Sequence, residues 1–174
     1  MQPIDEAILV NDPSRPDLPT LTRSQVWHGL VMKAEDATQF VPVITHCKVL
    51  ERFDGGLVRE INMGDRMMRE RVTFFPEERV RFEQMDGPLQ GGWVDNILDQ
   101  DANGALRLRF VFSGPIAGPP GGPPGGGPGG PPGGGPPGGG PPGGPPGDIK
   151  PIYRVALENT LTAVRRLVQE GKLR

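Results

Sequence analysis

Arg59 and Glu70 are the two charged residues whose positions best suit chemistry in a protein interior. Apolar residues recur every second position around each of them, at 57, 61 and 63 near the arginine and at 68, 72 and 74 near the glutamate. In a β-strand such alternation puts the charged residue on the same face as its apolar neighbours. Because a buried unpaired charge is strongly unfavourable, we expect the two side chains to pair if both point inward.

Four further residues fall on or near the same predicted inner surface. The alternation brings Gln84 and Phe110 inward, and it brings Asn96 inward too, although Trp93 and Ile97 leave that register open. Tyr153 lies near the apolar stripe of the last helix. A largely apolar pocket with a few polar groups is the usual form of a small-molecule site. The predicted ligand-binding residues are Arg59, Glu70, Gln84, Asn96, Phe110 and Tyr153.

Two alternatives stay open for this set. The charged residues could form a satisfied structural ion pair with no further role, or the register could be shifted by one residue. Glu70 could also act as an acid or base in a reaction. No catalytic residue is assigned from the sequence.

Other patterns that resemble functional motifs have ordinary explanations. His46 and Cys47 are adjacent, so in a strand they point to opposite faces and cannot share a metal ion. Residues 99–104 match the first half of a calcium loop, but the position of its bidentate glutamate is Phe110, which favours a hairpin turn. The glycines at 125–130 satisfy a dinucleotide-binding pattern only because they belong to a repeat. We predict no metal ion and no cofactor.

Bulk properties narrow the classes of partner. The chain has 174 residues, a formal net charge of −2 and one cysteine, Cys47. There is no excess of basic residues to follow a phosphate backbone, so we expect no nucleic-acid partner. No apolar run approaches the ~20 residues of a membrane span, and the N-terminus lacks a signal-peptide pattern. These features predict a cytoplasmic protein without a membrane span.

The elements that position the candidate residues follow from hydrophobic periodicity. Residues 4–10 fit a first strand, and Thr22 to Gln25 match a capping box that opens a helix. A second short helix is expected over 35–40. From residue 44 the period is two, and short turns join the segments, which favours an antiparallel meander. Its six predicted strands are Ile44–Phe53, Leu57–Met63, Met67–Phe75, Arg79–Met85, Trp93–Asp99 and Leu106–Ser113.

The C-terminal segment 148–173 is predicted to be one long helix with an apolar stripe that includes Ile152, Leu157, Leu161 and Val164. Before it, residues 119–147 are 16 Gly and 13 Pro in 29 positions, which predicts a disordered low-complexity linker. One domain therefore consists of residues 1–118 and 148–174. A linker of this length also allows a helix-swapped homodimer.

The order of these elements, with several local motifs, resembles the helix-grip fold of the START-like (SRPBCC) superfamily, and within it the AtaL-like group. The resemblance covers residues 3–118 and 148–174. The segments that carry it are 11–27, Phe40-Val-Pro42, Val49-Leu-Glu-Arg52, Arg69-Glu-Arg-Val72 and Arg79-Val-Arg-Phe82.

This resemblance implies an α+β fold in which a curved seven-stranded antiparallel sheet surrounds the C-terminal helix and encloses a hydrophobic cavity. It further implies a small-molecule binding protein for an apolar or aromatic ligand. The alternative is a polyketide cyclase or aromatase-like enzyme acting in the same cavity. An assembly scaffold built on swapped helices is a third hypothesis.

Overall fold

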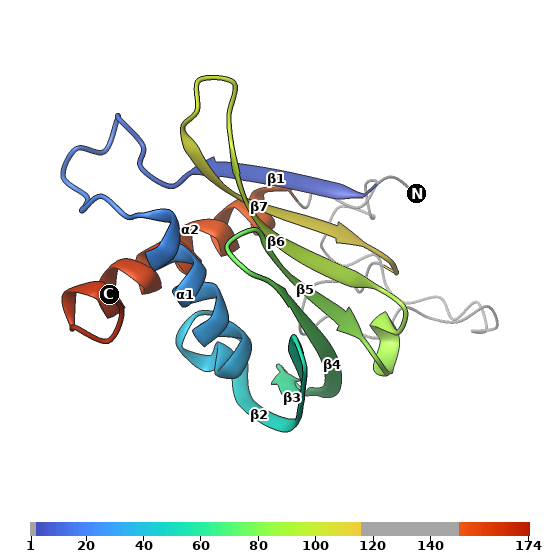
Figure 1. The fold of residues 1–174 in the computed structure, drawn as a ribbon. Coiled ribbons are helices and arrows are strands. Elements are labelled where there is room, and N and C mark those ends of the chain that lie inside the picture. The colour runs from blue at the N-terminus through green and yellow to red at the C-terminus, as the bar shows by residue number, and fades with distance from the viewer. Residues whose placement is uncertain (1–2, 116–149) are drawn as a thin grey trace, which may run out of the picture.

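Seven antiparallel strands form a single sheet in the computed structural model, which describes residues 3–115 and 150–174. The sheet order is β1-β7-β6-β5-β4-β3-β2, so every strand after β2 lies beside its sequence neighbour and β1 closes the far edge (Figure 1). The strands are β1 (Ile4–Leu9), β2 (Ile44–Phe53), β3 (Gly56–Met63), β4 (Arg66–Phe75), β5 (Arg79–Gln84), β6 (Trp93–Gln100) and β7 (Leu106–Ser113).

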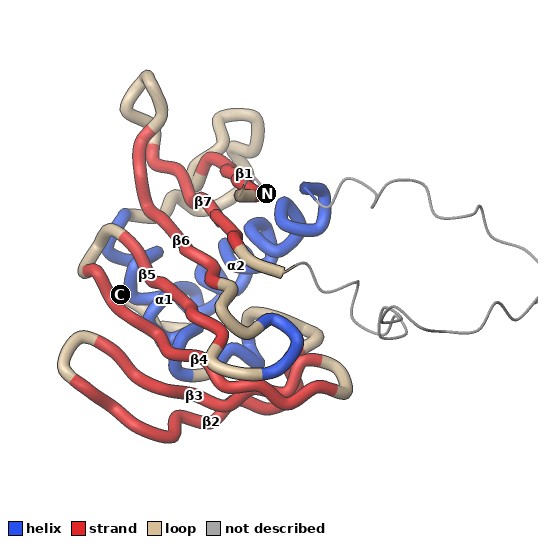
Figure 2. Tube along the Cα trace, turned by 90° about the vertical axis from the view of Figure 1, so that its right-hand side faces the viewer, coloured by secondary structure: helices blue, strands red, loops and turns tan. Residues whose placement is uncertain are grey.

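Two α-helices cover one face of this sheet, α1 (Arg23–Glu35) and α2 (Lys150–Gln169), as the turned view shows (Figure 2). The predicted capping box opens α1: the Thr22 hydroxyl accepts from the Gln25 backbone N–H at 3.1 Å, and the Gln25 side chain accepts from the Thr22 N–H at 2.9 Å. The expected short helix after α1 is the single turn η1 (Ala37–Gln39). A second 3₁₀ turn, η2 (Gly87–Leu89), connects β5 to β6.

The core lies between the sheet and the two helices. From α2 it receives Leu157, Leu161, Val164 and Leu167, all buried. Gly29 lets the helices approach closely, because a β-carbon at that position would lie 2.5 Å from a methyl group of Val164. This is the predicted α+β helix-grip arrangement, with α2 packed against β1, β7 and α1 of its own chain.

Helix α2 is shorter than the predicted 148–173. It ends at Gln169 because Gly171 takes a left-handed φ of 74°, and the backbone N–H of Lys172 bonds back to the Leu167 carbonyl at 2.9 Å. Ile152, expected in the buried stripe, is 59% exposed. The buried stripe therefore begins nearer to Leu157.

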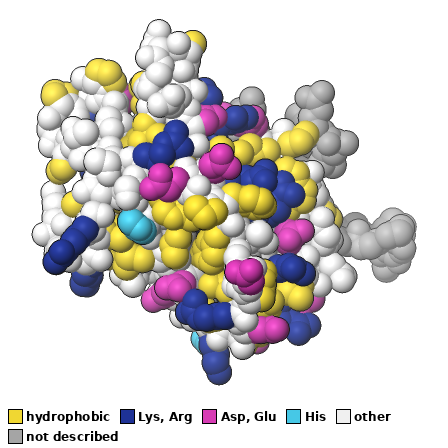
Figure 3. Space-filling model, in the orientation of Figure 1, with side chains coloured by type: hydrophobic (Ala, Val, Ile, Leu, Met, Phe, Trp, Pro, Cys, Tyr) yellow, Lys and Arg dark blue, Asp and Glu magenta, His cyan; other side chains and the backbone are white. Residues whose placement is uncertain are grey.

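Some predictions fall on residues that the structure does not describe. The Gly/Pro segment 119–147 and the expected N-cap Asp148 lie outside the described residues, and the helix-swapped homodimer stays a prediction. No helix within 3–115 or 150–174 has the length and apolarity needed to cross a membrane. Basic and acidic side chains are interspersed over the face of the molecule in Figure 3, with apolar groups between them.

Candidate functional site

Three polar side chains form a row across the inner face of neighbouring strands. Arg59 of β3 lies opposite Glu70 of β4, which lies opposite Gln84 of β5. The Arg59 guanidinium donates from Nε to Glu70 Oε2 at 2.7 Å, and its terminal nitrogen lies 2.6 Å from the same oxygen. The Gln84 amide donates to the other oxygen, Glu70 Oε1. All three residues are buried, so the predicted pair is present and the glutamine extends it.

Arg59 also closes the end of α1. Its NH1 donates to the backbone carbonyls of Lys33 at 2.8 Å and Ala34 at 3.0 Å. The last carbonyls of an α-helix have no partner within the helix, and a cation at that end also interacts favourably with the helix dipole. One guanidinium therefore links the row on the sheet to the helix that covers it.

The row of Arg59, Glu70 and Gln84 ends in an atom without a hydrogen-bond partner. Gln84 Oε1 is buried and has no hydrogen-bond partner among the described residues. An unpaired buried carbonyl of this kind costs about 1–3 kcal/mol. Asn62 Oδ1 is the second such atom, but it alternates with the inward Ile61 and points to the other face of the sheet. On the inner face the Gln84 carbonyl is thus an acceptor that a ligand hydroxyl or amine could use.

A second polar cluster joins α1, β6 and α2. The Lys33 ammonium group of α1 donates to Asn96 Oδ1 of β6 at 3.0 Å and to the Thr160 hydroxyl of α2 at 3.4 Å. It lies 4.4 Å from the centre of the Phe110 ring on β7. Asn96 therefore faces inward, as predicted, but its partner is a lysine that our sequence reasoning missed.

Lys33 is 7% exposed and is not ion-paired to a carboxylate among the described residues. Burial and, to a smaller extent, the nearby positive charge of Arg59 lower the pKa of its amine from 10.5 to about 7, against the opposing effect of Glu70. Near neutral pH the side chain is thus poised between ammonium and free amine.

A helical signal could have revealed Lys33. It follows Val26 and Leu30 at positions i+7 and i+3 of the same helix, and both of these are fully buried. Lysine near a helix C-terminus usually reflects a favourable interaction with the helix dipole at the surface. The same spacing equally predicts that this lysine points toward the core.

The two predicted aromatic residues occupy different environments. Phe110 is buried beside Lys33, whereas Tyr153 is only partly buried on α2 and packs against Phe112 with ring centres 6.1 Å apart. Burial raises the pKa of the Tyr153 hydroxyl. Among the described residues Tyr153 makes no hydrogen bond to either polar cluster. The structure thus places five of the six predicted residues in the two clusters and leaves the tyrosine apart.

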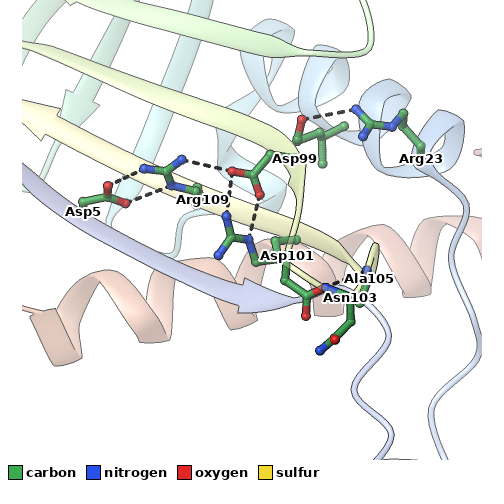
Figure 4. Close-up of polar contacts among 9 residues, drawn as sticks. Asp5, Arg23, Asp99, Asp101, Asn103, Ala105 and Arg109 are labelled. Atoms are coloured by element: carbon green, nitrogen blue, oxygen red, sulfur yellow. Dashed lines mark hydrogen bonds and ion pairs between the residues drawn. The ribbon is translucent and has the colours of Figure 1, made fainter.

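The outer face of the sheet carries a separate charged network with a structural role (Figure 4). Arg109 bridges Asp5 of β1 and Asp99 of β6, and Asp99 also accepts from Arg107 at 2.8 and 3.0 Å. Asp101 accepts from the backbone N–H groups of Asn103 and Ala105. The carboxylates of segment 99–104 are therefore committed to arginines and to a hairpin turn, as expected for a turn rather than a calcium loop.

The chemistry open to the inner face is that of its carboxylate, amides and amine. Within the described residues no group of three or more His, Cys, Asp and Glu side chains is arranged to hold a metal ion. A polar pocket of about 210 Å³ lies against loop 11–20 and Arg165, and none of the row residues lines it. The hydrophobic cavity expected between the sheet and the helices stays a prediction.

Comparison with protein families matches residues 8–124 to the family described as "AtaL: Acetylaranotin biosynthesis cluster protein L". No curated protein sequence matches the chain.

Solved structures share the fold at low sequence identity. The aromatase/cyclase StfQ from the steffimycin biosynthetic pathway is 9% identical with a TM-score of 0.60, over 97% of this chain and 51% of that one. This chain thus spans about half the length of that di-domain protein. The Zhui aromatase/cyclase from a Streptomyces species is 14% identical (TM-score 0.54; 96% and 95% covered), and Ara h 8.0201 is 11% identical (0.51; 97% and 98%). These structural similarities support the fold described above, a seven-stranded antiparallel sheet covered by helices.

Proposed function

The chain belongs to the AtaL family, and we propose that it binds a small apolar or aromatic molecule between its sheet and its helices. The observation that carries this proposal is the unpaired, buried Gln84 carbonyl oxygen at the end of the Arg59–Glu70 row. A ligand with a donor group would satisfy this oxygen, while the apolar side chains around it would bury the rest of the ligand.

The neighbouring side chains suit a flat ring system. Phe82 lies on the same inner face, two residues before Gln84, and the Arg59 guanidinium stacks on its ring with 4.8 Å between carbon and ring centre. The ion pair keeps both charges satisfied without help from a ligand. The ligand therefore needs to supply only one donor, which favours a phenol or an enol over a charged group.

A matched pair of probes tests this proposal. We expect 2-naphthol to bind about tenfold more tightly than 2-methoxynaphthalene, which lacks the donor, by isothermal titration calorimetry. In Gln84→Met this ratio should fall to about one, because the acceptor is gone, while Gln100→Met at an exposed position should retain it. Equal affinities in the wild-type protein would refute the role of Gln84. No binding of either probe would refute the ligand-binding function.

A second candidate function is a polyketide cyclase or aromatase-like reaction in the same interior. It is favoured by the presence of a buried carboxylate, Glu70, and a buried amine, Lys33, since such groups can act as acid and base. Two of the structural neighbours also carry the aromatase/cyclase name.

This reaction can be assayed with a synthetic poly-β-ketone thioester, with ring formation followed by absorbance. An enzyme of this class should form the aromatic product faster than the buffer control does, and Glu70→Gln should slow it. If Glu70→Gln alters probe affinity while the wild-type protein gives no product, the enzyme hypothesis is rejected and the binding function stands.

A further inference from the structure

Lys33 is a buried amine that the binding proposal does not use. Its side chain extends from the last turn of α1 into the interior, where the groups around it come from three other elements. They are Asn96 from β6, Thr160 from α2 and the Phe110 ring from β7.

The two hydrogen-bond partners of Lys33 are neutral acceptors. Thr160 donates its own hydroxyl proton to the Ala156 carbonyl at 2.9 Å, so toward Lys33 it can only accept. Asn96 accepts through its side-chain oxygen. A free amine has two N–H groups and one lone pair. Asn96 and Thr160 take up the two N–H groups, and the lone pair remains free for another atom.

The charged surroundings of Lys33 disfavour its ammonium form. Arg59 on β3 brings a positive charge close to this residue, since its guanidinium donates to the backbone carbonyl of Lys33 at 2.8 Å. Glu70 on β4 has the opposite effect, but both of its oxygens are already bonded to Arg59 and Gln84. The Phe110 ring and the hydrogen bonds to Asn96 and Thr160 favour the cation, whereas the loss of hydration on burial opposes it. Desolvation beside another cation is a recognised way of activating a lysine as a nucleophile.

We propose that Nζ of Lys33 is the nucleophile of this interior and condenses with an aldehyde or ketone ligand to form an imine. The inference rests on the proposed binding function, since the ligand must first enter the interior. The amine lone pair forms the new C–N bond while the carbonyl π electrons move to oxygen. Two protons pass from nitrogen to that oxygen, and it leaves as water. The products are one imine and one water molecule, and no other reactant is required.

The ligand class therefore narrows to apolar or aromatic carbonyl compounds. The amine lies deep between sheet and helices, beside an aromatic ring and away from bulk water, which disfavours hydrolysis of the imine. The lowered pKa of Lys33, about 7, provides free amine at neutral pH, and the exposed Lys48 serves as the comparison.

The test compares 1-naphthaldehyde with 1-naphthalenemethanol, which has the same rings and no carbonyl. Binding of both is measured by calorimetry, and the aldehyde is then trapped with sodium cyanoborohydride and mapped by peptide mass spectrometry. We expect both probes to bind and the reduced adduct to form at Lys33 at least tenfold faster than at Lys48. The rate at Lys33 should level off above pH 7.

Lys33→Met should abolish the fast adduct and still bind 1-naphthalenemethanol. The matched control Lys48→Met should keep the fast adduct at Lys33. The wild-type peptide map decides the matter even if Lys33→Met fails to fold. Binding of both probes with no preference for Lys33 overturns the imine and leaves the binding function intact. The proposal is also overturned if 1-naphthoate binds more tightly than 1-naphthaldehyde and the aldehyde forms no adduct at Lys33. The lysine would then act as an ammonium partner for an anion. If neither probe binds, both proposals fail.

Discussion

Replacing Arg59 by methionine tests whether the buried row holds the fold together. We expect Arg59→Met to lower the free energy of unfolding by about 3–5 kcal/mol at neutral pH. The side chains of Arg59 and Glu70 are only 4% and 6% exposed, so the substitution would leave the buried carboxyl group without its cation and with Gln84 as its remaining donor. The carbonyls of Lys33 and Ala34 would also lose their side-chain donor.

A surface pair provides the matched control for this substitution. Arg52 on the adjacent strand β2 contacts Glu35 at 2.8 Å, also near the end of α1, but these two side chains are 62% and 42% exposed. Because water screens exposed pairs, Arg52→Met should change stability by less than about 1 kcal/mol. The two substitutions remove the same group from neighbouring strands, so the difference between their stability losses measures the effect of burial.

Replacing the Glu70 carboxyl group as well should restore part of the lost stability. The double variant Arg59→Met/Glu70→Gln should be more stable than Arg59→Met by about 2 kcal/mol, because an amide is less unfavourable than a carboxylate in the interior. Urea unfolding, followed by the fluorescence of Trp27 and Trp93 and by circular dichroism, measures each value. If Arg59→Met resembles Arg52→Met, or if the double variant is no better than the single one, the charge argument is wrong.

Three further substitutions test other features of the structure. The pKa of Lys33 is about 7 in the folded protein, against 10.5 for an ordinary lysine as in the unfolded chain, so the unfolded chain binds more protons between these two pH values. The wild-type protein should therefore gain stability relative to Lys33→Met as pH rises from 7 to 10, in urea titrations at several pH values; a parallel pH profile would refute the burial of a lowered-pKa amine. Gly29→Ala should lose about 1–3 kcal/mol, because the new β-carbon would clash with Val164, and a neutral effect in thermal unfolding would contradict the close approach. Thr22→Ala should lower the free energy of unfolding by about 1 kcal/mol, because it removes the N-cap of α1, while Thr22→Ser should retain most of the wild-type stability.

The strands of the fold were predictable because their signals are local. The bounds of β2 and β7 are those predicted, and each of the other five strands differs from its predicted range by one residue. Short turns separate the strands, and a two-residue period shows which face is buried, so neighbouring segments pair in sequence order. The capping box likewise located the start of α1. The end of α2 was misplaced because the left-handed conformation of Gly171, not the apolar pattern, decides it.

The candidate site was predictable only in part, for a physical reason. Arg59, Glu70 and Gln84 occupy adjacent strands of a meander, so their register follows from the turns between them. Lys33 and Asn96 are 63 positions apart on a helix and a strand, and no local pattern relates them. Their contact depends on how α1 packs across the sheet, which is set by the whole core.

Gln84 and the partner of Lys33, Asn96, lie in different parts of the inner face. Asn96 lies opposite Val80 on β5, and Gln84 is four residues further along the same strand, which separates Asn96 from Gln84 by roughly 13 Å at ~3.3 Å per residue. Effects of substitutions more than about 10 Å apart usually add. Loss of the hydroxyl preference in Gln84→Met and loss of the adduct in Lys33→Met should therefore be independent. Coupling between them would mean that one ligand spans both clusters, and that it is as long as a fused three-ring or four-ring system.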